Sequence, residues 1–334
     1  MLYASVMEGD ALRQFIERHS RLFILTGAGC STDSGIPDYR DADGGWKRAQ
    51  PVQFRAFMDE PLTRKRYWAR SLVGWRRFGR ARPNDAHRAL AALERQGRVG
   101  LLVTQNVDRL HQAAGSEAVV DLHGRLDTVR CMDCERLMPR EALQQELLQH
   151  NREWADLDAW SLSDSGAPSR GRPPSSSLPR SFRAHSTAYV SGRISASCRC
   201  GSSAAGEPES DRLLVAPDGD ADLTGLDFFN FNVPACAHCG GLLKPDVVFY
   251  GESVPRERVE RARQAVAEAD AMLVVGSSLM VYSGYRFARE AALAGKPIAA
   301  VNLGRTRADD LISLKVTQSC ASALAFLLEE SDLA

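Results

Sequence analysis

The chain contains the stretch Gly27-Ala28-Gly29-Cys30-Ser31-Thr32-Asp33-Ser34-Gly35-Ile36-Pro37-Asp38-Tyr39-Arg40, which only Thr26 separates from the apolar run 22–25. A buried strand that enters a glycine-rich turn and then a helix presents backbone N–H groups to the pyrophosphate of a dinucleotide. The spacing differs from G-x-G-x-x-G, so a tight connection without a ligand is the alternative on the glycines alone. The proline, carboxylate, aromatic ring and guanidinium that follow favour a nucleotide site.

Short apolar runs alternate with amphipathic segments on both sides of this turn. We predict strands at 21–26, 99–104, 117–121, 271–276 and 297–302. We predict helices at 9–20, 84–96, 107–114, 255–269, 283–295 and 320–330. Short, continuously apolar strands between helices are typical of a parallel sheet that is covered on both faces. The predicted fold class is therefore α/β with a doubly wound parallel sheet, and ligands are expected at the carboxyl ends of its strands.

Four cysteines form a separate signal. Cys131/Cys134 and Cys236/Cys239 are two Cys-x-x-Cys pairs, and four thiolates complete a tetrahedral Zn²⁺ site without an open position. Such a site is structural. His238 inside the second pair is an alternative ligand, but the four cysteines are already a complete set. Cys198-Arg199-Cys200 is a competing pair whose spacing is poor for chelation.

The opening stretch resembles the signature of the sirtuins, which are NAD-dependent protein deacylases. Three further blocks match that family in order, namely Thr104-Gln105-Asn106-Val107-Asp108-Arg109-Leu110-His111, Leu122-His123-Gly124 and the two cysteine pairs. The segments 66–70, 214–220 and 241–251 are most similar to class II sirtuins, the group with the mitochondrial-type members and their bacterial relatives. The resemblance implies a Rossmann-like sheet of the sirtuin type with a small inserted zinc-ribbon module. It covers nearly the whole chain except residues near 161–210.

The resemblance also implies a division into domains. The NAD-binding domain is expected to comprise residues 1–125 and 245–334, and the zinc module residues 126–160 and 211–244. Between 161 and 210, 15 of 50 residues are serine and apolar periodicity is lacking. Such a segment buries too little surface to offset its ordering entropy, so we predict a disordered insertion there.

His123 is the candidate catalytic base, with Asn106 and Asp108 as further catalytic residues. An imidazole titrates near neutrality and accepts a proton from a ribose hydroxyl. Taken alone, His123 would be interpreted as a hydrogen-bonded structural histidine, and the alternative for Asp108 is a helix N-cap or first-turn acid. The sirtuin resemblance implies the catalytic roles. His111 is expected to pack or cap, and His19 and His87 to be surface or helix residues.

The resemblance further implies which residues hold NAD and one structural Zn²⁺. The cofactor residues are Gly27, Ala28, Gly29, Ser31, Ser34, Gly35, Ile36, Pro37, Asp38, Tyr39, Arg40, Gln105, Asn106, Val107, Asp108, Gly276, Ser277, Ser278, Asn302, Leu303, Gly304 and Cys320. The zinc ligands are Cys131, Cys134, Cys236 and Cys239. For Cys320 the alternative is a small buried apolar residue. Cys30 departs from the aliphatic residue expected in the signature.

The implied reaction transfers an acyl group from a protein lysine to ADP-ribose and releases nicotinamide. The acyl-lysine peptide is expected to add as a strand, with residues 247–252 as one flanking strand. Alternatives are a mono-ADP-ribosyltransferase that uses the same pocket, or a catalytically silent NAD-binding module. Tyr67 and Arg70 have a spacing that reads acidic acyl groups in some sirtuins, although a solvated basic face is the preferred interpretation of the arginine-rich stretch 64–77.

Composition bounds the partners. The 42 basic residues balance 42 acidic ones, so no net field attracts nucleic acid or an anionic membrane. No apolar run approaches the length of a membrane span. Residues 1–20 include acidic side chains and are interpreted as a first helix rather than a transit peptide. Free cysteine pairs suit a reducing compartment, so a cytoplasmic location is expected.

Overall fold

A computed structural model describes residues 2–47, 51–154, 218–219, 221, 223 and 226–329, with the side chains of residues 2–7 left aside. The serine-rich segment 161–210 and the Cys198/Cys200 pair lie outside the described residues. No helix in the described part of the chain is long and apolar enough to cross a membrane.

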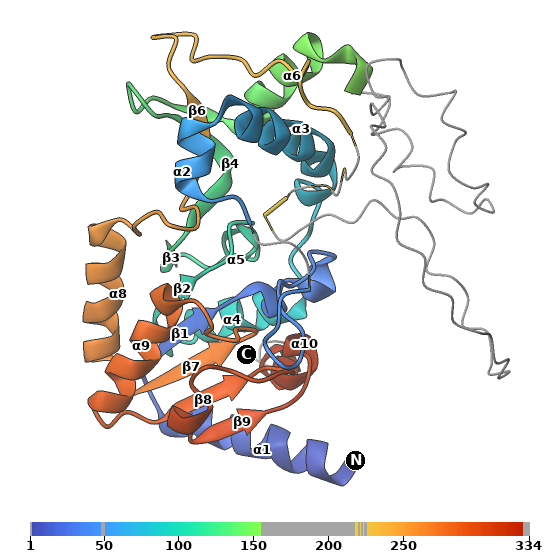
Figure 1. Ribbon diagram of the computed structural model, residues 1–334. Helices are drawn as coiled ribbons and strands as arrows, with labels where there is room; N and C mark the ends of the chain where they lie inside the picture. Colours follow the sequence, from blue (N-terminus) through green and yellow to red (C-terminus); the bar gives the residue numbers. More distant parts are fainter. Residues whose placement is uncertain are drawn as a thin grey trace, which may run out of the picture.

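A parallel sheet of six strands forms the larger half of the molecule (Figure 1), which confirms the predicted fold class. Its spatial order is β3-β2-β1-β7-β8-β9. The strands are β1 (Leu22–Thr26), β2 (Val99–Thr104), β3 (Val119–Asp121), β7 (Ala271–Val275), β8 (Ile298–Val301) and β9 (Leu314–Val316). The chain builds outward from β1 in one direction and from β7 in the other. The topological switch point, where such sheets bind ligands, therefore lies between β1 and β7.

Helices cover both faces of this sheet, as the continuously buried strands require. One face packs against α1 (Leu2–Arg18), α4 (Asp85–Arg95), α10 (Cys320–Leu324) and α11 (Phe326–Glu329). The other packs against α8 (Arg256–Glu268) and α9 (Tyr282–Leu293). Helix α4 begins where the Asn84 side chain accepts hydrogen bonds from the first-turn amides, a cap that stabilises a helix by about 1 kcal/mol.

A smaller antiparallel sheet has the order β5-β4-β6 and lies beside the first (Figure 1). Its strands are β4 (Gly124–Cys131), β5 (Leu137–Pro139) and β6 (Leu243–Val247), and α2 (Phe54–Asp59), α3 (Pro61–Phe78) and α6 (Arg140–His150) pack around it. Trp68 of α3 is fully buried there and donates to Leu243 O at 3.2 Å. Residues 54–78, which precede the predicted module, thus share one core with it.

The structure corrects several predicted boundaries. The glycine turn leads into two short 3₁₀ turns, η1 (Ala28–Cys30) and η2 (Thr32–Ser34), instead of a helix. The helix predicted at 107–114 shrinks to α5 (Leu110–Ala113), because Arg109 adopts a left-handed conformation with φ 64°. The last helix divides into α10 and α11, and the first begins at Leu2. A further 3₁₀ turn, η4 (Asp309–Leu311), precedes β9.

Candidate active site

A cavity of about 830 Å³ opens at the carboxyl ends of β1, β2, β7 and β8, where the two sheets meet. Most of the residues predicted to hold NAD line it. They are Gly27, Ala28, Gly29, Ser31, Ile36, Asp38, Tyr39, Arg40, Gln105, Asn106, Val107, Asp108, Gly276, Ser277, Ser278, Asn302, Leu303, Gly304 and Cys320. Ser34, Gly35 and Pro37 are absent from this lining. The candidate base His123 lines the same cavity.

Glycines allow the two loops at the switch point to touch through their backbones. Gly29 N donates to Gly276 O at 2.8 Å, and Gly27 N donates to Val275 O at 3.1 Å. Gly276 has φ +62°, and a Cβ there would lie 2.2 Å from Cys30 N. A side chain at this position would therefore separate the loops that form the floor of the cavity.

A polar network spans the cavity from β1 to β2. The Ser31 hydroxyl donates to Asp108 Oδ2 at 2.7 Å and accepts from Asn106 Nδ2 at 3.0 Å. Asn106 Nδ2 also donates to Gly27 O at 3.0 Å. Burial raises the pKa of Asp108, while hydrogen bonds from Leu110 N and Ser31 act in the opposite direction. Asn106 and Asp108, two of the three predicted catalytic residues, are thus held together by Ser31 of the glycine-rich loop.

His123 follows β3 and points into the cavity with a defined tautomer. Nδ1 lies 3.0 Å from Gln105 O, which only accepts, so Nδ1 carries the hydrogen and Nε2 the lone pair. The Ser283 hydroxyl donates to Nε2 at 2.7 Å. Burial lowers the pKa of His123 to about 4, and the positive charges of Arg258 and Arg286 act in the same direction. The imidazole is therefore neutral at pH 7 and able to accept a proton.

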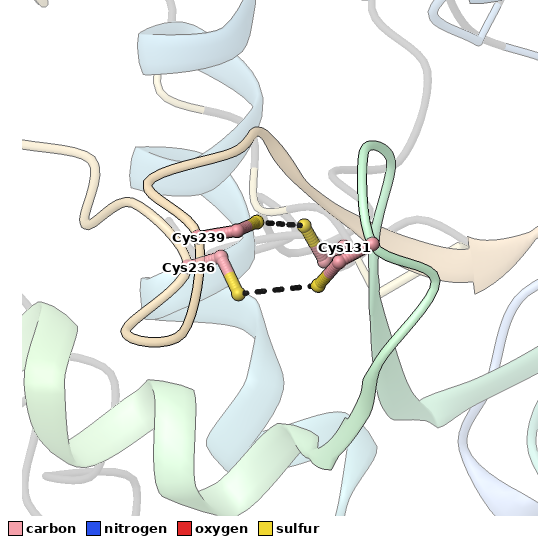
Figure 2. A group of neighbouring side chains, drawn as sticks. Cys131, Cys236 and Cys239 are labelled. Atoms are coloured by element: carbon pink, nitrogen blue, oxygen red, sulfur yellow. Dashed lines mark hydrogen bonds between the residues drawn. The ribbon is translucent and has the colours of Figure 1, made fainter.

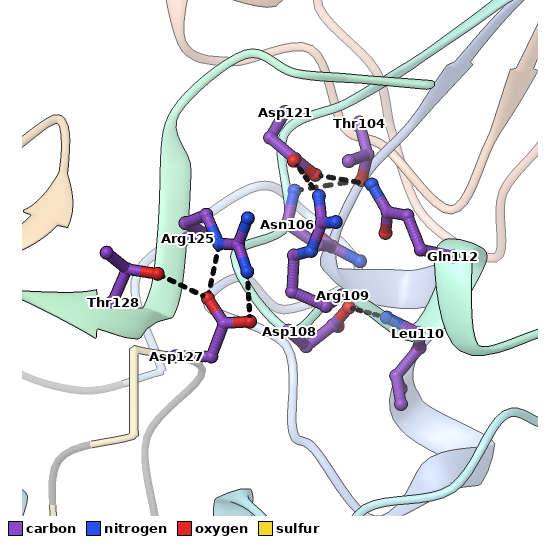
Figure 3. Close-up of polar contacts among 10 residues, drawn as sticks. All are labelled: Thr104, Asn106, Asp108, Arg109, Leu110, Gln112, Asp121, Arg125, Asp127 and Thr128. Atoms are coloured by element: carbon purple, nitrogen blue, oxygen red, sulfur yellow. Dashed lines mark hydrogen bonds and ion pairs between the residues drawn. The ribbon is translucent and has the colours of Figure 1, made fainter. Parts of the chain in front are cut away.

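Ion pairs and hydrogen bonds hold the turns that follow β2 and β3 (Figure 3). Asp121, at the end of β3, accepts from the Arg109 guanidinium and, at 2.9 Å, from Gln112 Nε2. Asp108 accepts from Leu110 N, the first residue of α5, at 2.9 Å, but it lies one position before the N-cap residue Arg109. The same carboxylate thus fixes the start of α5 and forms part of the cavity wall.

Ser283, Arg286 and the segment 279–282 were not predicted, although they line the cavity. Thr32, Asp41, Ala42, Lys47, Asp218, Ser253, Val254, Arg305, Gln318 and Ser319 are further lining residues that the sequence analysis did not single out. The one signal in the sequence that could have located residues 279–283 is that they come soon after the predicted Gly276-Ser277-Ser278.

Arg40, one of the predicted NAD-binding residues, carries its guanidinium 3.6 Å above the Trp46 ring and donates to Gly44 O.

Two side-chain interpretations need correction. Tyr67 is 2% exposed and packs edge-on against Phe57, so this face of α3 is not the solvated basic face that was preferred. Arg70 donates to Ala221 O at 2.9 Å, and neither Tyr67 nor Arg70 belongs to the cavity lining. His87 lies in helix α4, in agreement with the prediction of a surface or helix residue, and its side chain is completely buried.

The segment predicted to flank a bound peptide is only partly a strand. Val247 ends β6, and residues 248–252 continue along the cavity wall. Val248 N donates to His123 O at 2.8 Å, which ties this wall to the candidate base. Phe249 N is held by the Glu252 carboxylate at 2.9 Å.

The four cysteines meet at the far end of the small sheet (Figure 2). Cys131 Sγ and Cys239 Sγ are 3.4 Å apart, and Cys134 Sγ and Cys236 Sγ are 3.8 Å apart. All four sulfurs lie within 4.8 Å of one another. Thiolates around a tetrahedral Zn²⁺ lie about 3.8 Å apart, because Zn–S bonds are about 2.3 Å long. The donor set and spacing therefore fit a closed, structural zinc site.

The molecule thus has two unequal lobes. The larger is a doubly wound sheet with a cavity and a neutral histidine at its switch point, and the smaller carries the four cysteines. The larger lobe is of the class of α/β folds that bind nucleotides at this position. A protein-family model described as the Sir2 family matches residues 27–283. The chain therefore belongs to the Sir2 family, whose members are the sirtuins.

Relatives with curated names agree with this assignment. A protein of Xanthomonas campestris pv. campestris named NAD-dependent protein deacetylase is 58% identical over 332 residues, which cover 99% of this chain and 95% of the relative. NAD-dependent protein deacetylase 2 of Bradyrhizobium diazoefficiens is 55% identical over 322 residues, covering 96% and 98%. A solved structure described as Sir2-p53 peptide-NAD+ is 26% identical, with a TM-score of 0.63 and coverage of 97% of this chain and 98% of that one.

Proposed function

We infer that this protein is an NAD-dependent protein deacylase that transfers an acyl group from lysine to ADP-ribose. The observation that carries the inference is the neutral His123 with its Nε2 lone pair in the cavity, opposite the glycine-rich loop of β1. Relatives that match almost the whole chain are named NAD-dependent protein deacetylases. NAD, when bound, supplies the ribose that accepts the acyl group and nicotinamide as the leaving group.

We assign His123 as the general base that removes a proton from a ribose hydroxyl. A pKa near 4 leaves nearly all of the imidazole in the basic form at pH 7, although it also makes Nε2 a weaker proton acceptor. The Nδ1–H bond to Gln105 O orients the ring and stabilises the positive charge that forms when Nε2 takes the proton. The Ser283 hydroxyl occupies Nε2 in this structure and must yield to the ribose hydroxyl.

Asn106 and Asp108 are assigned to positioning. Ser31 links both side chains and holds them on the side of the cavity formed by β1 and β2. Both amide hydrogens of Asn106 are donated to Gly27 O and Ser31 Oγ, so Asn106 Oδ1 and the Asp108 carboxylate offer acceptors to a ribose hydroxyl or a water. The cofactor-contact residues predicted from the sequence remain the proposed NAD-binding set, with the cavity lining as support for all except Ser34, Gly35 and Pro37.

The substrate is an acyl-lysine in a protein or peptide. A solved Sir2 structure of the same fold is described as holding a p53 peptide and NAD+. We propose that residues 247–252 flank the peptide, since they line the cavity and are tied to His123 through Val248. One structural Zn²⁺ in the four-cysteine site maintains the module from which β6 leads into this segment.

We also propose the domain division 1–125 with 245–334 and 126–160 with 211–244. Residues 54–78 fall in the first unit by this division, although α2 and α3 pack in one core with β4 of the second. The cytoplasmic location and the absence of nucleic-acid and membrane partners stay predictions from charge and composition.

The test is mass spectrometry of the products formed from NAD and a panel of acyl-lysine peptides. Acyl-ADP-ribose should form with at least one acyl group, and the variant His123→Ala should lose at least 100-fold in rate, the order expected for a missing general base. His150→Ala, an exposed histidine on α6, is the matched control and should retain activity. ADP-ribose attached to protein without acyl transfer would instead establish the transferase, and no NAD turnover would favour the silent NAD-binding module.

A further inference from the structure

A second group of metal-type ligands lies beneath the cavity. Cys30, His87 and His111 come from η1, α4 and α5, and they are 1%, 0% and 1% exposed. One ligand atom from each lies within 4.8 Å of the other two. The group is separate from the four-cysteine site, and the proposed reaction uses none of its members.

The hydrogen bonds of His111 leave one ring nitrogen as an unused acceptor. The Thr26 hydroxyl donates to Thr104 Oγ1 at 2.9 Å, so it accepts from His111 Nε2–H, also at 2.9 Å. Nδ1 therefore carries the lone pair, and it is buried without a hydrogen-bond partner among the described residues. An unsatisfied buried acceptor of this kind costs about 1–3 kcal/mol, which a bound cation would recover.

His87 can offer its second nitrogen to the same group in one of its two tautomers. Asn84 meets Nδ1 of His87 in two ways, since its Oδ1 lies 2.9 Å and its backbone N 3.3 Å from that nitrogen. Zinc binding requires the tautomer in which Nδ1–H donates to Asn84 Oδ1, so that Nε2, whose contact is 3.4 Å to Ser31 Oγ, carries the lone pair. The His87 and His111 rings lie 4.7 Å apart between centroids. Burial lowers the pKa of both imidazoles, so both are neutral and have lone pairs at pH 7.

We propose that Cys30, His87 and His111 form a second metal site that binds Zn²⁺. One thiolate and two imidazoles are a donor set for zinc rather than for Mg²⁺ or Ca²⁺, which prefer oxygen. On binding, the Cys30 thiol releases its proton to solvent, a Zn–S bond forms, and the two nitrogens donate their lone pairs. The buried site then holds one net positive charge.

The site is coupled to the NAD cavity through Ser31. This residue follows Cys30 directly, contacts His87 and donates to Asp108. Ligands of a tetrahedral zinc lie about 3.3–3.6 Å apart, given bonds of about 2.0–2.3 Å. The three ligand atoms lie within 4.8 Å of one another, so zinc binding would draw any pair together by no more than about 1.5 Å. Cys30 belongs to the glycine-rich loop that lines the cavity, and a shift of Cys30 moves that loop, so the second Zn²⁺ should weaken NAD binding.

The test counts zinc in the full-length protein and in two cysteine variants. After equilibration with excess Zn²⁺ and removal of free metal, mass spectrometry of the metal should give two ions per chain for the wild type. Cys30→Val should give one ion, and Cys320→Val, which alters another buried cysteine near the cavity, should give two. Cys30→Ser is the second variant if valine disturbs folding, and it should hold the second ion more weakly.

The coupling has its own readout. NAD affinity, measured by calorimetry, should fall at least several-fold in wild type when the second Zn²⁺ is bound and should not respond to Zn²⁺ in Cys30→Val. One ion per chain in the wild type would overturn the proposal. A second ion that survives in Cys30→Val would also overturn it, since that ion would be bound elsewhere. Neither result depends on whether the protein is a deacylase.

Discussion

Replacement of Gly276 by alanine tests how the cavity floor is built. Gly276 has φ +62°, a conformation that costs an L-residue about 1–2 kcal/mol. The new Cβ would also lie 2.2 Å from Cys30 N and 2.5 Å from Gly29 C. These are backbone atoms, so the loop itself must shift, and such overpacking costs typically about 1–3 kcal/mol. We expect Gly276→Ala to lower the free energy of unfolding by about 2–5 kcal/mol.

Gly295 provides the matched control. It also has a positive φ, +69°, but a Cβ there meets nothing within 4 Å, and it lies outside the cavity lining. Gly295→Ala should therefore lose only the conformational part, about 1–2 kcal/mol. Urea unfolding should separate the two variants by about 1–3 kcal/mol, and NAD binding should weaken only in Gly276→Ala. Equal losses of stability with unchanged NAD affinity would refute the close approach of the two loops.

Three further outcomes follow from the site. Because burial lowers the pKa of His123 from 6.5 to about 4, the acid limb of kcat/KM should lie near pH 4 to 5; a limb near 6.5 would contradict a buried neutral base. Ser283→Ala removes a donor that stabilises the neutral imidazole of His123 by about 1 kcal/mol, so the acid limb should move upward by less than about one pH unit. An acid limb that stays in place or moves to lower pH would rule out the contact. Cys131→Ser should lower bound zinc by one ion per chain and abolish cooperative unfolding of the small module, seen by metal analysis and circular dichroism; retention of that zinc would exclude Cys131 as a ligand.

Stability should also depend on pH through the buried histidines. The pKa values of His87 and His123 are lowered to about 4 in the folded protein, so the unfolded chain binds more protons between pH 6.5 and 4. The stabilisation is present above pH 6.5 and is lost as the pH falls towards 4.

The strands of the parallel sheet were predictable because each is a continuous apolar run between polar or glycine-containing segments. Helix α3 was harder to interpret. Its sequence is rich in arginine, yet Trp68 and Tyr67 are buried, and the charged groups reach past them to solvent or to backbone oxygens. Strand β4 alternates buried and half-exposed residues between two partners and has no apolar run to mark it.

The glycine-rich loop, the β2 motif and His123 could be located because each carries its chemistry in a short segment. Ser283 could not, since its contact with His123 joins residues 160 positions apart. The cluster of Cys30, His87 and His111 could not be predicted for the same reason. Its residues come from three elements that are distant in the sequence and meet in one core, and each residue alone has the pattern of an ordinary buried side chain.

Two of the connections between the sheets run side by side at His123. One leaves β3 through Leu122 and enters β4, and the other leaves β6 at Val247, paired with Gly124. The bond from Val248 N to His123 O joins them. The backbone that carries the candidate base is therefore fastened to both connections between the sheets. A displacement of β6 at Val247 would be transmitted through Val248 to His123, so the position of the base depends on how the small sheet is held.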